Sequence, residues 1–271
     1  MNKNFFEFIV VILVYRNADD LKECVESVYE KINSSRVVVV NAYYDDDSSK
    51  KISDLAEKLN CDFIEVENKG YSYGNNRGIQ YALERYDFNY IIISNPDIIV
   101  KEFPKLNMTD ADVIAPKTIT LSGKNQNPMM IRENRLSEFL IYQGLKRNIK
   151  ILFTAGIAVN KIQEKILRKD NKIIQNIFAA HGSFVIINKG VVEKINPLYD
   201  ENFFLFAEEG VLAYRCREHN FRTVYNPNVL VNHKEDGSMK LADFSINNEL
   251  KKANIYFYEK YVKKQNKRRK E

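Results

Sequence analysis

The sequence predicts an α/β fold, in which a mainly parallel, twisted sheet is flanked by helices. Continuous apolar runs rich in β-branched residues occur at 8–15, 36–40 and 90–93, as expected for strands buried on both faces. After the first run, apolar residues recur at helical spacing in Leu21, Cys24, Val25 and Val28, which indicates a helix with one buried face. Strands that alternate with helices form right-handed βαβ units, so we expect these strands to be parallel.

The other elements of the first half follow from caps and spacing. Asn17 or Asp20 can cap the first helix, and Ser48 can cap a second helix before a further strand at 63–66. The segment from Gly70 to Gly78 is punctuated by glycines and is expected to be a loop, with the next helix starting at Ile79. Pro96 ends the strand at 90–93, and another strand is expected at 112–115.

The second half is less regular. Strands are expected at 183–188 and 224–233, with helices at 190–195 and after Glu208-Glu209. From 145 to 169, apolar runs alternate with Lys and Arg, and the apolar stretch at 151–159 is too short to cross a membrane. We interpret this stretch as a core or interfacial helix.

Composition places the chain among globular proteins of a reducing compartment. Hydrophobic residues make up 45% of the 271 residues, enough for a substantial core in one large domain. The three cysteines are far apart and form no CxxC pair, which favours the cytosol. The apolar stretch near the N-terminus lacks the length of a membrane span and a cleavage site, so it is expected to be a strand.

The net charge of +5 is concentrated at the C-terminus. From 259 to 271 there are seven Lys or Arg against two Glu, and aromatic residues precede them. Nucleic-acid binding usually needs basic residues spread over a folded face, so we do not expect a nucleic-acid partner. The segment fits an anionic membrane surface, while a solvated, frayed end is the alternative.

Several familiar sites can be excluded by their motifs. The chain has no G-x-x-x-x-G-K-[ST] motif, which excludes a P-loop. Gly70, Gly74 and Gly78 are evenly spaced, so they do not form the G-x-G-x-x-G motif of a dinucleotide-binding site. The chain also lacks H-E-x-x-H and G-x-S-x-G, so a zinc hydrolase and a serine esterase of those classes are excluded.

Polar residues instead follow successive predicted strands. Asn41 and the acids at 45–47 follow the second strand, the glycine segment follows the third, and Asp97 follows the fourth. Ligands of open α/β sheets bind at the carboxyl ends of the strands. A carboxylate there can hold Mg²⁺ or Mn²⁺ against a diphosphate, and a glycine-rich helix start can approach an anion. A turn or a solvated acidic cluster is the alternative for each feature alone.

These residues resemble glycosyltransferase family 2 in their order along the chain. The resemblance covers about residues 8–235 and rests on 11–28, 37–48, 67–78, Gly182-Ser183-Phe184, Asp200 through Glu209, and 224–233. Ser94-Asn95-Pro96-Asp97 resembles the metal motif of the rhamnosyltransferase-like branch, where other members have Asp-x-Asp.

The resemblance implies a GT-A fold and an inverting, metal-dependent transfer from a nucleoside-diphosphate sugar. It divides the chain into a nucleotide-sugar-binding half at 1–116, an acceptor-binding and catalytic half at 117–238, and a helical basic tail at 239–271. Asp97 and His233 are expected to hold the metal, and Glu209 to be the general base with Glu208 beside it. The residues expected to border the nucleotide are Tyr15, Asn17, Asn41, Gly70, Asn76 and Asn95. His181 precedes a strand near the expected acceptor cleft.

The predicted function is therefore hexosyl or rhamnosyl transfer from a UDP- or dTDP-sugar to a growing, lipid-linked glycan of a bacterial cell-surface polysaccharide such as a capsule. The expected location is the cytoplasmic face of the cell membrane, and a homodimer is left open. Tyr43-Tyr44 and Val211 depart from the family pattern and keep open a catalytically inactive nucleotide-binding partner subunit. A sugar-nucleotidyltransferase is disfavoured because residues 15–19 lack the basic glycine-rich loop of that class.

Overall fold

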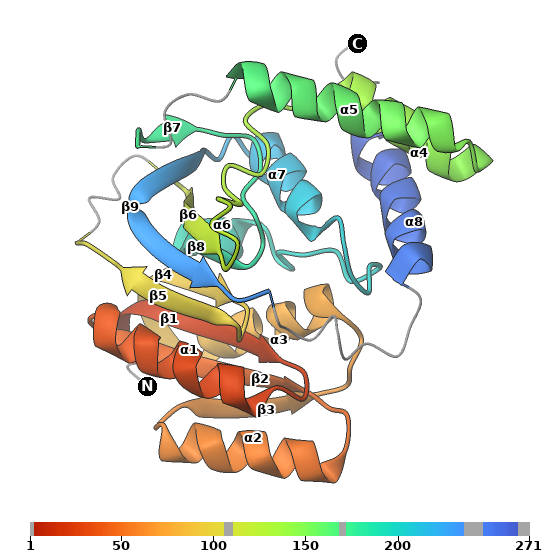
Figure 1. Ribbon diagram of the computed structural model, residues 1–271. Coiled ribbons are helices and arrows are strands. Elements are labelled where there is room, and N and C mark those ends of the chain that lie inside the picture. Colours follow the sequence, from red (N-terminus) through yellow and green to blue (C-terminus); the bar gives the residue numbers. More distant parts are fainter. Residues whose placement is uncertain (1–2, 106–110, 168–171, 236–245, 265–271) are drawn as a thin grey trace.

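A single mixed sheet organises the whole chain. The computed structural model describes residues 3–105, 111–167, 172–235 and 246–264 (Figure 1). The strand order is β3-β2-β1-β4-β8-β6-β9-β5, with β7 paired to β9. Both halves of the sequence contribute strands to this sheet, so the described residues form one α/β domain, as predicted.

The first half of the sheet is parallel. It consists of β1 (Asn4–Val14), β2 (Ser35–Ala42), β3 (Asp62–Val66) and β4 (Tyr86–Ser94), connected through α1 (Ala18–Lys31), α2 (Asp46–Lys58) and α3 (Tyr71–Arg85). β1 pairs in parallel with both β2 and β4, and β2 pairs in parallel with β3. These are the βαβ units that the alternating pattern predicts.

The second half of the sheet is mixed rather than mainly parallel. β8 (Phe184–Asn188) runs antiparallel to both β4 and β6 (Val113–Thr120). β9 (Thr223–His233) is parallel to β6 but antiparallel to β5 (Ile98–Glu102) and to β7 (Gln175–Asn176). β6 and β9 therefore run in the same direction as β1 to β4, so most strands of the sheet are oriented in parallel, as predicted. The exceptions are β5, β7 and β8, which run in the opposite direction.

The core lies on both faces of the sheet. Alternate residues of β1 point to opposite faces, so Ile9 and Val11 pack with α3, while Val10 and Ile12 pack with α1 and α2. The α3 face also receives α6 (Lys189–Lys194) and α7 (Glu208–Glu218). Strands covered on both faces explain the continuous apolar runs in the sequence.

Two helix starts differ from the sequence prediction. Asn17 caps α1 as expected, but Asp45, not Ser48, caps α2 by accepting a hydrogen bond from the Ser48 N–H. α3 begins at Tyr71, so the glycine segment belongs to the helix and is not a loop. A Cβ on Gly74 or Gly78 would overlap side chains of β1, so these glycines allow α3 to lie close against the sheet.

The remaining helices gather at one end of the molecule (Figure 1). α4 (Arg135–Arg147) and α5 (Lys150–Leu167) form an antiparallel hairpin, beside which lie α8 (Ile246–Phe257) and the π-helical turn η2 (Tyr258–Val262). Within the described ranges, no helix combines the length and apolar character that a membrane crossing requires. Of the predicted helical basic tail at 239–271, residues 246–264 are described, and residues 239–245 and 265–271 lie outside the described residues.

Asp200 fastens the C-terminal segment to the domain. Burial alone would raise the pKa of this carboxyl group, but hydrogen bonds from Lys260, Tyr261 and Asn202 lower its pKa to about 2. Lys260 Nζ and the Tyr261 hydroxyl both lie 2.7 Å from Asp200 Oδ2. The start of the basic segment is therefore held against the loop that precedes α7.

Gly70→Ala is expected to destabilise the fold by at least about 2 kcal/mol, because it adds steric overlap to a strained backbone. Gly70 has a φ of 97°, and a Cβ there would lie 2.1 Å from the Phe204 carbonyl oxygen. The measurement is the free energy of unfolding in urea.

Gly123→Ala is the matched control for this change. Gly123 has a φ of 80°, but a Cβ there would meet no atom within 4 Å, so only the backbone penalty of about 1–2 kcal/mol should appear. Equal losses in the two variants would show that contact with Phe204 is unimportant.

Candidate functional site

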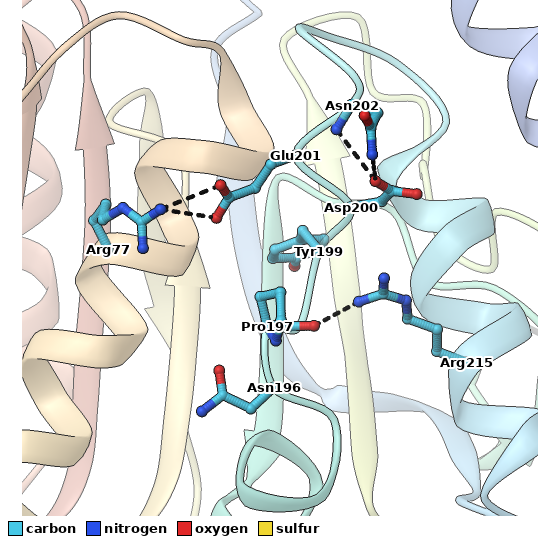
Figure 2. A pocket seen from close by; sticks show the side chains of 8 residues that line it. All are labelled: Arg77, Asn196, Pro197, Tyr199, Asp200, Glu201, Asn202 and Arg215. Atoms are coloured by element: carbon cyan, nitrogen blue, oxygen red, sulfur yellow. Dashed lines mark hydrogen bonds and ion pairs between the residues drawn. The ribbon is translucent and has the colours of Figure 1, made fainter.

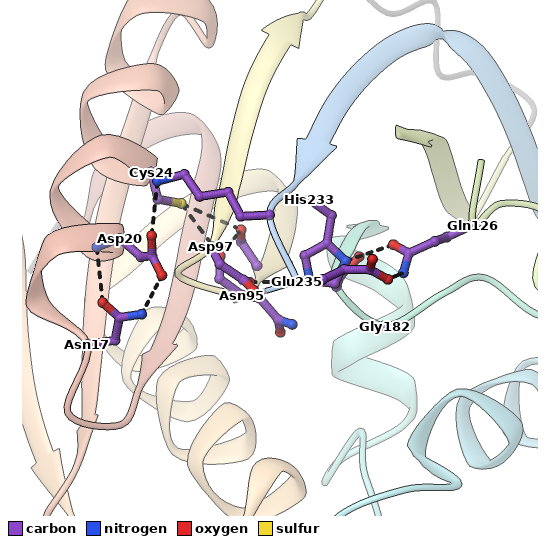
Figure 3. Close-up of polar contacts among 12 residues, drawn as sticks. Asn17, Asp20, Cys24, Asn95, Asp97, Gln126, Gly182, His233 and Glu235 are labelled. Carbon is purple, nitrogen blue, oxygen red and sulfur yellow. Dashed lines mark hydrogen bonds and ion pairs between the residues drawn. The ribbon is translucent and has the colours of Figure 1, made fainter. Parts of the chain in front are cut away.

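The candidate site is built around Asp97, just beyond the carboxyl end of β4. Pro96 ends the strand, and the chain reverses into β5, which pairs with the last strand, β9. The register places Ile98 opposite His233, and Asp97 Oδ1 therefore lies 3.3 Å from His233 Nε2 (Figure 3). Both side chains are buried. The two residues predicted as metal ligands are thus brought together.

Hydrogen bonds from a neighbouring loop fix the orientation of the His233 ring. Gln126 Nε2 donates to Glu235 Oε1 at 3.0 Å, because a carboxylate can only accept. Gln126 Oε1 must then accept the proton of His233 Nδ1 at 2.7 Å (Figure 3). In neutral His233, the lone pair of Nε2 consequently faces Asp97.

This arrangement leaves two acceptors facing each other. Asp97 Oδ1 is enclosed and has no hydrogen-bond donor among the described residues. A cation between Oδ1 and Nε2, either a proton or a metal ion, satisfies both atoms. An oxygen and an imidazole nitrogen fit a divalent ion that completes its coordination with phosphate and water oxygens. The described residues contain no group of three or more metal-ligating side chains, so the protein alone supplies a partial site.

Asn95 is held beside this pair by its backbone. Its N–H donates to the Ser183 carbonyl at 2.8 Å, and its carbonyl accepts from the Ser94 hydroxyl at 2.9 Å. The Cys24 thiol also contacts this carbonyl, and burial raises the pKa of Cys24 to about 12. Cys24 therefore stays a protonated packing residue, as its position on the apolar face of α1 suggests.

The second pair of acids begins α7 on a strained backbone. Phe206 and Ala207 have φ values of 73° and 66°, in the left-handed region that non-glycine residues rarely adopt. No side chain caps the helix at Ala207, and Glu208 and Glu209 occupy its first turn, where the helix dipole favours negative charge. Strain of this kind is concentrated at functional sites.

The two adjacent glutamates have different surroundings. Glu209 Oε1 accepts a hydrogen bond from the Gly182 N–H at 3.3 Å. A Cβ on Gly182 would lie only 3.2 Å from the same oxygen, so glycine allows this approach. Glu208 Oε2 is enclosed without a hydrogen-bond partner, and burial, together with the charge of Glu209, raises the pKa of Glu208 well above its usual value.

His181 lies between the Asp97–His233 pair and Glu209. Its ring centroid lies 5.8 Å from that of His233, and it is followed by Gly182, the contact of Glu209. Its Nδ1 lies 2.9 Å from the Ser183 hydroxyl, and burial lowers its pKa. The sequence placed His181 near the acceptor cleft because it precedes a strand, but gave no signal for Gln126, which lies in a loop.

Three other predicted residues lie at the same edge of the sheet, after β1 or at the end of β2. Tyr15 packs edge-on against Tyr44, with ring centroids 5.7 Å apart, and Asn17 serves as the N-cap of α1. Asn41 is buried, and its Nδ2 lies 3.2 Å from both Ser49 Oγ and Glu65 Oε2. The donor group of Asn41 is therefore used within the protein.

Gly70 and Asn76 contact the segment that precedes α7. Asn76 makes two hydrogen bonds with the Tyr199 backbone, at 2.9 Å to its carbonyl and 3.0 Å from its N–H. Gly70 touches Phe204, as described above. In this structure both residues hold the 199–204 segment in place.

A hollow of about 410 Å³ lies between α3 and α7 (Figure 2). Its lining includes Arg77, Glu201 and Arg215, and none of the predicted site residues. Arg77 pairs with Glu201 at 3.2 Å, and Arg215 donates to the Pro197 carbonyl at 2.5 Å (Figure 2). These internal bonds tie the 197–201 segment to both helices, so we assign the hollow a structural role.

Comparison with protein families identifies the class. The model of the glycosyltransferase-like family 2 matches residues 7–252. The chain belongs to this family, as the ordered motifs predict. A comparison with curated protein sequences gave no significant match.

Solved structures support the same fold. A crystal structure of GalNAc-T7 with UDP, GalNAc and Mn²⁺ is similar over 86% of this chain, with a TM-score of 0.60 and 15% sequence identity. A crystal structure of S. aureus TarS is similar over 90% of this chain, with a TM-score of 0.55 and 14% identity. The chain spans 44% of the first protein and 41% of the second. The likeness confirms the predicted GT-A type of fold.

Glu208→Gln is expected to stabilise the protein at neutral pH. The folded-state pKa of Glu208 is raised. Its contribution to the free energy of unfolding is therefore fully present below the unfolded-state pKa and is lost as the pH rises toward the folded-state pKa. This loss is at most about 1.4 kcal/mol per pH unit for one proton. A neutral Gln at this position does not lose stability in this way. The difference in the free energy of unfolding between Glu208→Gln and the parent protein should therefore vanish near pH 4.

The measurement is urea unfolding of both proteins between pH 4 and pH 8. Glu218→Gln, at the exposed opposite end of α7, should show no such pH-dependent difference. An advantage of Glu208→Gln that is the same at every pH would contradict the assignment of a protonated Glu208.

Proposed function

We propose that the chain is an inverting glycosyltransferase that moves a sugar from a nucleoside-diphosphate sugar to a glycan acceptor. The observation that carries this proposal is the enclosed Asp97 carboxylate, which faces the His233 lone pair at the carboxyl edge of the sheet in a family 2 chain. A second carboxylate, Glu209, lies beside the same edge through Gly182. Such a site suits a charged donor and a hydroxyl acceptor.

Asp97 and His233 would hold Mg²⁺ or Mn²⁺, with Gln126 fixing the His233 tautomer. When bound, the ion would stabilise the negative charge of the departing nucleoside diphosphate. The similarity to a protein crystallised with UDP and Mn²⁺ supports this choice of cofactor. Most of the coordination would come from the donor and water, because this chain supplies few ligands.

The nucleotide would lie in the 1–116 half, over the carboxyl ends of β1, β2 and β4. Tyr15 and Asn41 would border the base, and Asn17 and Asn95 would lie along the ribose and diphosphate. Gly70 and Asn76 would act indirectly, through the segment that leads to Glu208 and Glu209. This division assigns the acceptor to the 117–238 half.

Glu209 would act as the general base. As the acceptor oxygen forms its bond to the anomeric carbon, the hydroxyl proton passes to the Glu209 carboxylate, and the bond from that carbon to the diphosphate oxygen breaks. The Gly182 N–H holds one carboxylate oxygen at 3.3 Å, which orients the other for the proton. Glu208 would remain protonated, because its side chain is enclosed beside Glu209.

The acceptor would be a growing lipid-linked glycan of a bacterial cell-surface polysaccharide, such as a capsule, with the protein at the inner face of the membrane. Asn95-Pro96-Asp97 favours the rhamnosyltransferase-like branch with a UDP- or dTDP-sugar donor. The basic C-terminal segment of 239–271, in which Lys260 and Tyr261 are hydrogen-bonded to Asp200, would attract an anionic membrane.

An inactive, nucleotide-binding partner subunit is the second candidate. Val211 lies on the buried face of α7, at a position where the family often has a further acid. This observation favours the alternative. Donor hydrolysis by the purified protein alone would exclude it.

Asp97→Ala should abolish Mn²⁺-dependent nucleotide binding and transfer. The protein should stay folded, because the change removes a buried acceptor that has no hydrogen-bond donor. The measurement is the thermal shift produced by UDP, dTDP and GDP, each with and without Mn²⁺, because a ligand of the native state raises its apparent stability. Asp54→Ala, an exposed acid on α2, is the control. Full transfer by Asp97→Ala in the presence of EDTA would refute the metal assignment.

Glu209→Gln should lower kcat by about 10²–10⁴-fold, the usual contribution of a general base, with nucleotide affinity unchanged. Steady-state transfer and nucleotide titration measure the two effects separately, and Glu218→Gln serves as the control on the same helix. If Glu209→Gln instead lost nucleotide binding at unchanged kcat, Glu209 would be a donor-binding residue.

A further inference from the structure

The α4–α5 hairpin exposes a surface that its own fold does not cover. Six large apolar residues of this hairpin are exposed, and α5 contributes the most open of them: Ile151 at 74%, Ile162 at 60% and Ile166 at 76%. The other three are Leu136, Phe139 and Ile149. Exposed apolar residues gathered in this way mark an interaction surface rather than scattered surface positions.

The exposed residues of α5 lie along one side of the helix. At about 100° per residue, Ile151, Ala158, Ile162 and Ile166 fall within a quarter of its circumference. Lys161 and Lys165 are exposed along one flank of this stripe, with Thr154. The opposite side of α5 packs closely on α4, where Gly156 lies against Ile141. α5 is therefore amphipathic, with an apolar stripe and a basic flank directed outward.

Charge decides what this face can bind. Over residues 135–167, the exposed side chains include Lys146, Arg147, Lys150, Lys161 and Lys165, and none is Asp or Glu. The two acids of this stretch point inward, since Glu138 accepts from the Tyr214 hydroxyl and Glu164 accepts from the Ile131 N–H. Lys146 pairs with Glu259, which leaves Arg147, Lys150, Lys161 and Lys165 as the other exposed basic residues of the hairpin.

We propose that the outward face of α5, formed by its exposed isoleucines together with Lys161 and Lys165, binds an anionic phospholipid surface. Isoleucines enter the boundary between headgroups and acyl chains, while lysines beside them contact lipid phosphates. A symmetric contact between two copies of the face would place lysines against lysines with no acid to offset them. The charge pattern therefore favours lipid over a second copy.

The position of the hairpin agrees with a role next to the acceptor. α5 holds the 130–132 segment through Glu164 and Gln163, and Met130 pairs with Ala179 in both directions, at 3.2 Å and 3.0 Å. Ala179 lies two residues before His181. η2 stacks on α4 through Tyr258 and Tyr142, with ring centroids 4.2 Å apart, so Lys263 and Lys264 follow beside the same hairpin. The placement of the lipid surface next to the acceptor rests on the proposed function, whereas lipid binding by α5 does not.

The test is co-sedimentation of the full chain with vesicles, without donor or metal. The probes are vesicles of phosphatidylcholine and phosphatidylglycerol in equal parts, and vesicles of pure phosphatidylcholine. We expect binding to the mixed vesicles that weakens with added salt, and much weaker binding to the neutral ones. Ile162→Gln/Ile166→Gln and Lys161→Ala/Lys165→Ala should each lower the partition coefficient by about tenfold or more.

Matched controls keep the test specific. Leu121→Gln replaces an apolar residue that is 73% exposed outside the hairpin, and Lys51→Ala/Lys58→Ala removes two exposed lysines of α2, at the far end of the molecule (Figure 1). Both should bind vesicles like the parent protein. All variants change exposed side chains, and their thermal unfolding is measured alongside to show that each remains folded.

Three results would overturn the proposal. The parent protein could fail to bind the mixed vesicles, or the hairpin variants could bind normally while deletion of 265–271 abolishes binding. Light scattering could also show a dimer that Ile162→Gln/Ile166→Gln dissociates, which would make the face a protein interface. Mn²⁺-dependent nucleotide binding, measured on the same variants, separates these outcomes from a failure of the proposed transferase activity.

Discussion

The enclosed carboxylate of Asp97 is the constraint on which the rest of the site depends. A buried acceptor without a donor is costly, and a buried negative charge is more so. The fold nevertheless holds Asp97 firmly, because Pro96 ends β4, β5 turns back at once, and pairing of β5 with β9 places His233 at 3.3 Å. Gln126, which donates to Glu235, then fixes the orientation of the imidazole so that its Nε2 faces Asp97. The proposed cation would satisfy both of these atoms.

The change of direction at β8 brings the second half of the chain to this point. Because β8 runs antiparallel to β4, its first residue, Phe184, lies opposite Ser94, the last residue of β4. The residues before β8, His181 to Ser183, therefore fall at the same edge as Asn95 and Asp97. In a purely parallel sheet, the start of β8 would lie at the opposite edge. Glu209 reaches the site through Gly182 for this reason.

The sequence reveals those parts of the fold that depend on local patterns. The buried strands at 8–15, 36–40 and 90–93, the Asn17 cap and the acid Asp97 at a strand end all have local signals. His233 and Glu209 were assigned through the resemblance to the family. β5 was missed because Ile98–Glu102 is a short run just after a proline. α3 was placed too late, because glycines that usually signal a loop are needed here for close contact with Leu13 and Val11. Gln126 has no local signal, since its role follows from the pairing of distant strands.

The differing environments of Glu208 and Glu209 follow from the start of α7. Two left-handed residues, Phe206 and Ala207, turn the chain sharply, and successive helical side chains then diverge by about 100°. Glu208 is directed into an enclosed region, in which burial also raises the pKa of the Tyr199 hydroxyl, while Glu209 accepts a hydrogen bond from the Gly182 N–H. Environments that separate the protonation of two neighbouring acids are typical of sites that move protons. Of the two, Glu209, whose carboxylate is hydrogen-bonded to the Gly182 N–H, suits the proposed role of base. The left-handed turn before α7 thus places the two adjacent glutamates in different environments.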